Sequence, residues 1–69
     1  MNIPNYNDRC KQARATNTGD QWQHRKTGKT LRILKRLCRD VVEVQHQSGT
    51  VTAKQDHYLA GDYFLLPNT

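Results

Sequence analysis

The sequence predicts a small, mainly β domain of five short strands, and three observations lead to that prediction. Apolar and polar residues alternate in several short runs, which is typical of strands that bury one face. Glycines separate these runs at spacings that suit hairpin turns. The chain has only 69 residues, and a domain of that size buries only about 60% of the surface its unfolded chain exposes. We therefore expect a single domain with a thin core.

The N-terminal part differs in composition from the rest of the chain. Residues 1–18 show no sustained apolar period and end in a turn-forming stretch. We interpret them as a flexible arm, whereas residues 19–67 form the β domain. A short helix over residues 8–15 is the alternative, although no apolar face would hold it against the domain. Three cations make the arm basic: Arg9, Lys11 and Arg14.

The first two expected strands are joined by a glycine-containing loop. Residues 20–25 alternate, with Trp22 and His24 on one side. Residues 26–29 then form a hairpin loop in which Gly28 takes the position that needs a positive φ. The second strand follows over residues 30–36, with Leu31 and Ile33 on one face and Arg32, Leu34 and Arg36 on the other.

A helix is the competing interpretation of residues 30–39. Leu31, Leu34 and Cys38 lie at spacings of three and four residues, which also fit an amphipathic helix. The strand is favoured by its neighbours, because a glycine turn precedes the segment and a clear β segment follows it. In either case we expect Cys38 to behave as a small core hydrophobe.

The clearest hairpin lies in the second half of the chain. Residues 41–46 and 50–54 are rich in β-branched residues and alternate, and the residues between them, 47–49, form a three-residue loop that contains glycine. We expect Val42, Val44 and Val51 to face the core. One 3₁₀ turn follows over residues 55–59. A last strand over residues 63–66 ends at Pro67.

This order of elements resembles the SH3-like small barrels, a group that includes the KOW and Tudor modules. The resemblance rests on Trp22 in the first strand, the QSG hairpin and the HYLAGDYFLL ending. It covers residues 20–66 and implies a five-stranded barrel with one 3₁₀ turn before the last strand. No KOW or Tudor signature is present. In length and pattern the chain is also similar to small proteins of phages and mobile elements.

Several chemical functions find little support in the sequence. The string RKTGKT ends like a phosphate-binding loop, but Gln23 occupies the place of that motif's first glycine. The His and Cys residues do not form the close pairs typical of zinc sites. Cys38 could serve as a nucleophile with His46 as its base, but the apolar residues around Cys38 would raise the pKa of its thiol. We therefore predict a non-enzymatic protein with no catalytic residues, no metal site and no cofactor.

Positive charge is the most distinctive feature of the chain. The formal net charge is +5, and residues 21–39 hold seven of the eleven Lys and Arg residues and no acidic residue. Such a segment favours DNA or RNA as a partner, since Lys and Arg neutralise phosphates and release counterions. An acidic surface on another protein is the alternative partner. The predicted contact residues are Arg25, Lys26, Lys29, Arg32, Lys35, Arg36 and Arg39.

The cellular compartment is predicted from segments that the sequence lacks. It shows no secretory leader and no apolar run long enough to cross a membrane. The two cysteines, Cys10 and Cys38, are too few for a disulfide framework. These features predict free thiols in the reducing cytoplasm, and they leave the oligomeric state open.

Overall fold

The protein is mainly β, with one five-stranded sheet and two helices. The computed structural model describes residues 3–67. In chain order the elements are α1 (Tyr6–Arg14), β1 (Gln21–His24), β2 (Thr30–Cys38), β3 (Val41–His46), β4 (Val51–Gln55), α2 (Asp56–Asp62) and β5 (Tyr63–Leu65). All neighbouring strands are antiparallel, in the order β4-β3-β2-β1-β5. The strand interpretation of residues 30–38 is therefore correct, and the helical alternative is wrong.

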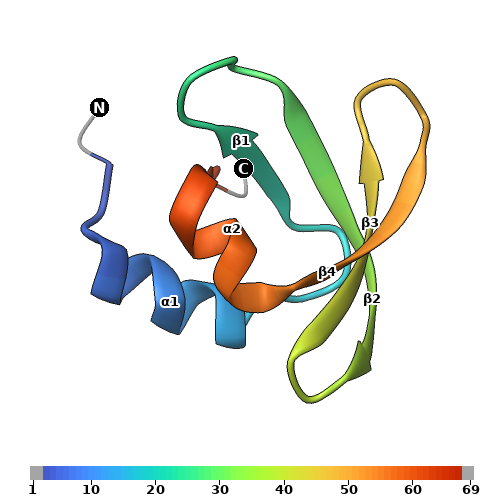
Figure 1. Cartoon of the computed structure of the whole chain (residues 1–69), viewed down its shortest axis with the longest axis horizontal. Helices are drawn as coiled ribbons and strands as arrows, with labels where there is room; N and C mark the ends of the chain where they lie inside the picture. Colours follow the sequence, from blue (N-terminus) through green and yellow to red (C-terminus); the bar gives the residue numbers. More distant parts are fainter. Residues whose placement is uncertain (1–2, 68–69) are drawn as a thin grey trace.

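The sheet is strongly bent, and the two helices lie side by side along one flank of it (Figure 1). The β1–β2 and β3–β4 hairpins point to the same end of the molecule, and the β2–β3 turn lies at the opposite end. β4 pairs only with β3 and β5 only with β1, so the two edge strands do not meet and the sheet is not closed. A closed barrel was expected, but the pairing leaves β4 and β5 as the two free edges of an open sheet.

The core lies on the face of the sheet that the helices cover. Strand pairing places Trp22 opposite Leu31 and Ile33 opposite Val44, so these side chains share one face. The buried cluster consists of Ala13, Trp22, Leu31, Ile33, Val42, Val44 and Leu59. Trp22 is fully buried, and its indole Nε1–H donates to Thr16 Oγ1 at 3.0 Å. This bond satisfies the one polar group of the largest core side chain.

Two residues expected in the core are exposed instead. Val51 is 49% exposed because it pairs with Gln45, whose side chain points away from the helices. The inward positions of β4 hold Thr52, opposite Val44, and Lys54, opposite Val42. Cys38 is also exposed, at the end of β2 beyond the second irregularity in its pairing with β3.

The glycine turns form as their sequences predict. Gly28 in the β1–β2 loop has φ +75° and Gly49 in the β3–β4 loop has φ +97°. Both values lie in the region that L side chains rarely adopt. Gly28 therefore takes the positive φ expected of it, and Gly49 lies in the glycine-containing loop expected between β3 and β4.

The N-terminal segment forms a helix, Tyr6–Arg14, which overlaps the alternative helix over residues 8–15, where a flexible arm was favoured. The side chain of Asn5 caps α1 by accepting a hydrogen bond from the backbone N–H of Asp8 at 2.9 Å. Ala13 and Arg9, four residues apart on one face of the helix, are both buried. The Arg9 side chain donates from Nε to Ala60 O in α2 and from Nη1 to Pro4 O, both at 2.6 Å. Thus an arginine and an alanine hold the helix in place of an apolar stripe. Residues 1 and 2 of the predicted arm lie outside the described residues.

The predicted 3₁₀ turn is instead the α-helix α2. It begins directly after β4 and runs for seven residues. Leu59 and Ala60 are fully buried and anchor it to the core and to α1. The backbone N–H of Asp56 donates to Asp40 O at 2.8 Å, which ties the start of α2 to the β2–β3 turn. Asp56 itself is buried.

Candidate nucleic-acid interface

The β1–β2 loop carries three of the predicted contact residues on a well-supported backbone. Arg25, Lys26 and Lys29 are all exposed. The imidazole Nδ1 of His24 accepts hydrogen bonds from the backbone N–H groups of Lys26 at 3.1 Å and Thr27 at 3.2 Å. The backbone N–H of Arg25 donates to Asp62 O at 2.9 Å, which fixes the loop to the end of α2. The three cations therefore project from a loop whose backbone is held in place.

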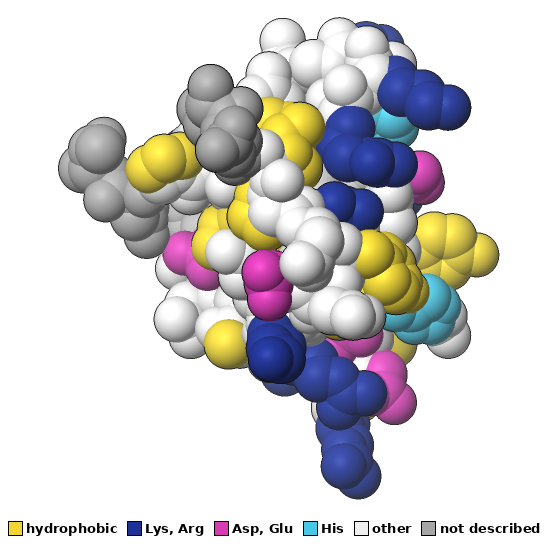
Figure 2. All heavy atoms as spheres, turned by 90° about the vertical axis from the view of Figure 1, so that its left-hand side faces the viewer, with side chains coloured by type: hydrophobic (Ala, Val, Ile, Leu, Met, Phe, Trp, Pro, Cys, Tyr) yellow, Lys and Arg dark blue, Asp and Glu magenta, His cyan; other side chains and the backbone are white. Residues whose placement is uncertain are grey.

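The predicted basic ribbon divides into two separate groups. β2 is nine residues long, and at about 3.3 Å per step its two ends are at most roughly 26 Å apart. Lys29 precedes one end, whereas Lys35 and Arg39 lie near the other. Figure 2 shows Lys and Arg side chains gathered at the height of the β1–β2 loop and again at the height of the β2–β3 turn. Acidic side chains lie between and beside the two groups.

The cations at the β2–β3 end have acidic neighbours. Lys35 is the cross-strand partner of Glu43, a pairing in which opposite charges attract. Arg39 is followed directly by Asp40 in the turn. Each of these two cations therefore has a carboxylate as its strand partner or its chain neighbour.

Arg36 is used within the fold, contrary to the sequence prediction. It was expected to share a face with Arg32, away from the core. A bulge between Ile33 and Lys35 shifts the register by one residue, so Arg36 pairs with Val42 on the core side. Its Nη2 donates to Ala13 O and Arg14 O, both at 3.1 Å, and its Nη1 donates to Arg39 O at 2.8 Å. Nη1 also lies 3.7 Å from the carboxylate of Asp56.

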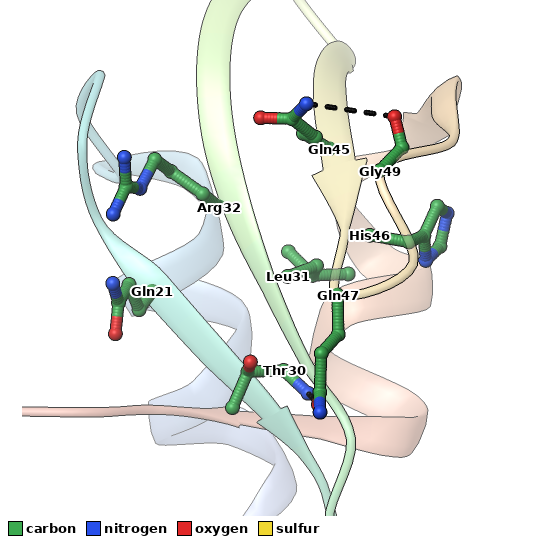
Figure 3. A pocket seen from close by; sticks show the side chains of 8 residues that line it. All are labelled: Gln21, Thr30, Leu31, Arg32, Gln45, His46, Gln47 and Gly49. Atoms are coloured by element: carbon green, nitrogen blue, oxygen red, sulfur yellow. Dashed lines mark hydrogen bonds between the residues drawn. The ribbon is translucent and has the colours of Figure 1, made fainter.

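Arg32 lies on the outer face of the sheet, as predicted. It is paired with Gln21 on one side and with Gln45 on the other. A shallow hollow of about 330 Å³ crosses these strands, and its lining is mostly polar. In Figure 3 the side chains of Arg32 and Gln21 lie on the same side of the sheet, while the ring of His46 points away from them. Arg32 is thus an exposed donor among amide side chains.

A second hollow, which sequence reasoning missed, opens between the two hairpins. It has a volume of about 630 Å³. Its inner wall consists of His24, His46, Thr52 and Tyr63, which lie at the strand ends on the core side of the sheet. Its rim is formed by the two hairpin loops and the start of β2: Thr27, Lys29, Thr30, Gln47, Ser48 and Thr50.

A signal for this hollow is present in the sequence. His24 follows Trp22 by two residues, and His46 follows Val44 by two, so each histidine continues an inward-facing row of a strand. Where an inward-facing row ends in a polar residue, that residue lies beyond the apolar core and can line a cavity.

The contacts within the inner wall indicate which of its polar atoms carry protons. The rings of His24 and Tyr63 meet edge to face, with centroids 4.9 Å apart. Burial, and after it the charge of Asp62, raises the pKa of the Tyr63 hydroxyl, so this group is a protonated donor at neutral pH. His46 Nε2 lies 2.8 Å from Thr52 Oγ1, within hydrogen-bond distance. Because His24 Nδ1 accepts two backbone hydrogen bonds, the neutral ring carries its proton on Nε2.

Two further kinds of site are absent from residues 3–67. No group of three or more His, Cys, Asp or Glu side chains in this part of the chain is arranged to hold a metal ion. None of its helices has the length and apolar character required to cross a membrane.

Comparisons of the chain with protein-family models, with curated proteins and with solved structures find no significant match.

Proposed function

We propose that this protein is a non-enzymatic module that binds nucleic acid through the β1–β2 hairpin. The proposal is supported by the exposure of Arg25, Lys26 and Lys29 and by their lack of acidic partners within residues 3–67. All three are exposed on a loop with a fixed backbone, and none forms an ion pair with another described residue. Cations without counter-charges gain most by neutralising phosphates, because no existing pair has to be broken.

Contacts of this type predict how binding depends on salt and on sequence. Three phosphate contacts give a slope of about −2 to −3 in a plot of log K against log salt concentration. Between 50 and 200 mM salt, affinity should therefore fall roughly twentyfold to fiftyfold. Since the loop cations contact phosphates and not base edges, they should confer little sequence preference.

The order of strands supports a finer proposal about the fold. We infer that the bent sheet is an open relative of the SH3-like small barrels. In its support, the strands follow the order β4-β3-β2-β1-β5 with a short helix between β4 and β5. In such an arrangement the β1–β2 loop projects from the sheet and is available to a ligand.

A matched pair of triple variants tests the proposed function. In the first, Arg25→Gln, Lys26→Gln and Lys29→Gln remove the hairpin charges. In the control, Lys11→Gln, Lys35→Gln and Arg39→Gln remove three exposed charges elsewhere. Each variant loses three positive charges, so each has a formal net charge of +2 in place of +5. Binding to labelled single-stranded DNA, duplex DNA and RNA is measured by fluorescence anisotropy at two salt concentrations.

We expect the hairpin variant to lose at least tenfold in affinity at low salt and most of its salt dependence. The control variant should lose only a few-fold. Equal losses in both would mean that net charge alone drives binding, and the hairpin proposal would be wrong. If no nucleic acid binds at all, while a protein from nuclease-treated lysate is retained and is released by salt, the partner is an acidic protein surface.

A further inference from the structure

We propose that the hollow between the two hairpins holds one unstacked base of a single-stranded nucleic acid. This inference rests on the proposed function, because the hairpin cations would hold the neighbouring phosphates. The hollow opens between the β1–β2 and β3–β4 hairpins, at the end of the molecule where both loops lie (Figure 1). Lys29 belongs both to the basic loop and to the rim of the hollow. A strand whose phosphates lie on the loop therefore passes the opening.

The size and the lining of the hollow suit a base with its sugar. Its volume of about 630 Å³ falls within the range of about 300–1,000 Å³ typical of small-ligand sites. The rings of His24, His46 and Tyr63 offer flat surfaces on which a base can stack. Hydroxyl groups and one side-chain amide surround them and can donate or accept hydrogen bonds. No carboxylate lines the hollow to repel phosphate.

The hydrogen bonds within the wall leave donors available to a ligand. His24 uses Nδ1 for the backbone of the loop, so its Nε2–H has no partner among the described residues. The Tyr63 hydroxyl is a protonated donor at neutral pH, as is usual for tyrosine, and burial moves its pKa further above neutral. Base edges present carbonyl oxygens and ring nitrogens that accept from such groups. The wall is therefore complementary to the edge of a base as well as to its face.

This geometry selects for single strands. A base within a duplex is stacked and paired, and it would have to leave the helix to enter the hollow. A base in a single strand is already free to turn outward. The loop cations alone would bind both forms, so the hollow is the feature that distinguishes them.

The first test compares two oligonucleotides that differ only in their bases. An oligothymidylate of about ten nucleotides, within the site size of small single-strand binders, is compared with an abasic strand of equal length. The hairpin cations can contact the same number of phosphates in both strands. We expect the wild-type protein to bind the thymidylate roughly tenfold more tightly, which is the contribution of one stacked base.

A matched pair of variants locates this preference. Thr50→Trp places a large ring at the exposed rim of the hollow and should reduce thymidylate affinity to the abasic value. Ala53→Trp adds the same ring on β4, on the outer face, and should leave the preference unchanged, because Ala53 is exposed and lies outside the hollow. Circular dichroism confirms that both variants fold.

The outcomes separate the two proposals. Equal wild-type affinities for the two strands, combined with loss of binding in the hairpin variant, would overturn the base site and keep the proposed function. The same holds if Thr50→Trp leaves the thymidylate preference intact. Titration with thymidine monophosphate, followed by NMR, gives a readout that needs no hairpin contact. We expect shifts at His46, Thr52 and Tyr63, and shifts confined to residues 25–29 would contradict the base site.

Discussion

Arg9 and Arg36 show how one residue type serves two purposes in this chain. Both occur in segments that are basic in sequence, and both belonged to the predicted phosphate-binding surface or arm. In the structure, Arg9 donates to a carbonyl in the last turn of α2, and Arg36 donates to two carbonyls in the last turn of α1. The final carbonyls of a helix have no partner within the helix and favour positive charge. Each arginine therefore completes a helix end.

The sequence could not distinguish these arginines from the exposed ones. The assignment depends on which helix end lies within reach, and for Arg36 it depends on the bulge after Ile33. One additional residue in a strand exchanges the two faces for every residue that follows. Arg32 precedes the bulge and was placed correctly, whereas Arg36 follows it and was not.

The substitution Arg36→Gln should destabilise the fold. Asp56 Oδ2 is buried without a hydrogen-bond partner among the described residues, and Arg36 is the cation 3.7 Å from it. Removing the charged partner of a buried group costs about 3–5 kcal/mol. Because the Arg36 side chain is 30% exposed, we expect a smaller loss of about 2–3 kcal/mol in the free energy of unfolding. Urea denaturation followed by Trp22 fluorescence measures it.

Arg32→Gln is the matched control on the same strand. Arg32 is exposed on the outer face, so its replacement should change stability by no more than about 0.5 kcal/mol. Similar losses in the two variants would show that Arg36 has no special structural role.

At the scale of elements, local sequence signals predicted strands better than helices. Residues 41–46 alternate and are rich in valine, and Gly49 marks the turn that follows, so propensity, pattern and turn chemistry agree. These signals locate β3 and β4 in the chain, but they do not set the facing of β4, since Val51 was expected inward and is exposed. In contrast, α1 buries only Arg9 and Ala13, and α2 has only Leu59 and Ala60 as buried apolar anchors. Too few apolar residues recur to reveal either helix by its period.

The candidate site was predicted only in part, for a related reason. The hairpin cations follow from the turn at Gly28 and from the local charge, both of which are local features of the sequence. The hollow brings together residues from β1, β3, β4 and β5, which are distant in the chain. Local alternation places His24 and His46 on inward-facing rows, but the bend and the open edge of the sheet, which bring these strand ends together, are not specified by any local pattern.

A pair of asparagine substitutions tests whether α1 is a stable part of the domain. Asn5 caps the helix through its side chain, so Asn5→Ala should lower the free energy of unfolding by about 1 kcal/mol. Asn7 is exposed in the first turn of the helix, and alanine has the higher helix propensity. Asn7→Ala should therefore raise stability by a few tenths of a kcal/mol.

Opposite effects of these two neighbouring changes require a helix that folds together with the sheet. Thermal unfolding followed by circular dichroism measures both. If neither substitution alters the transition, the N-terminal segment does not contribute to global stability, and the flexible arm is the better description.

At the scale of the whole molecule, compactness and charge act against each other. The radius of gyration is 10.8 Å, close to the value of about 11 Å expected for a compact domain of this length. The buried cluster nevertheless contains few large side chains. With a net charge of +5, the positive charges also repel one another within a small volume. A polyanion that binds the folded protein would relieve that repulsion and add binding free energy.

We therefore expect single-stranded oligothymidylate to raise the melting temperature. At a free concentration of about one hundred times the dissociation constant, a ligand of the folded state adds about 2.7 kcal/mol. For a domain of this size, each kcal/mol shifts the melting temperature by about 4–8 °C, so the rise should be roughly 10–20 °C.

Differential scanning calorimetry at low salt measures this rise, and the hairpin Gln variant at the same oligonucleotide concentration is the control. That variant should show little rise, and added salt should remove the rise in the wild type. An unchanged or lowered melting temperature in the wild type would mean that the basic chain binds polyanions equally well when unfolded, in which case the folded hairpin confers no binding site.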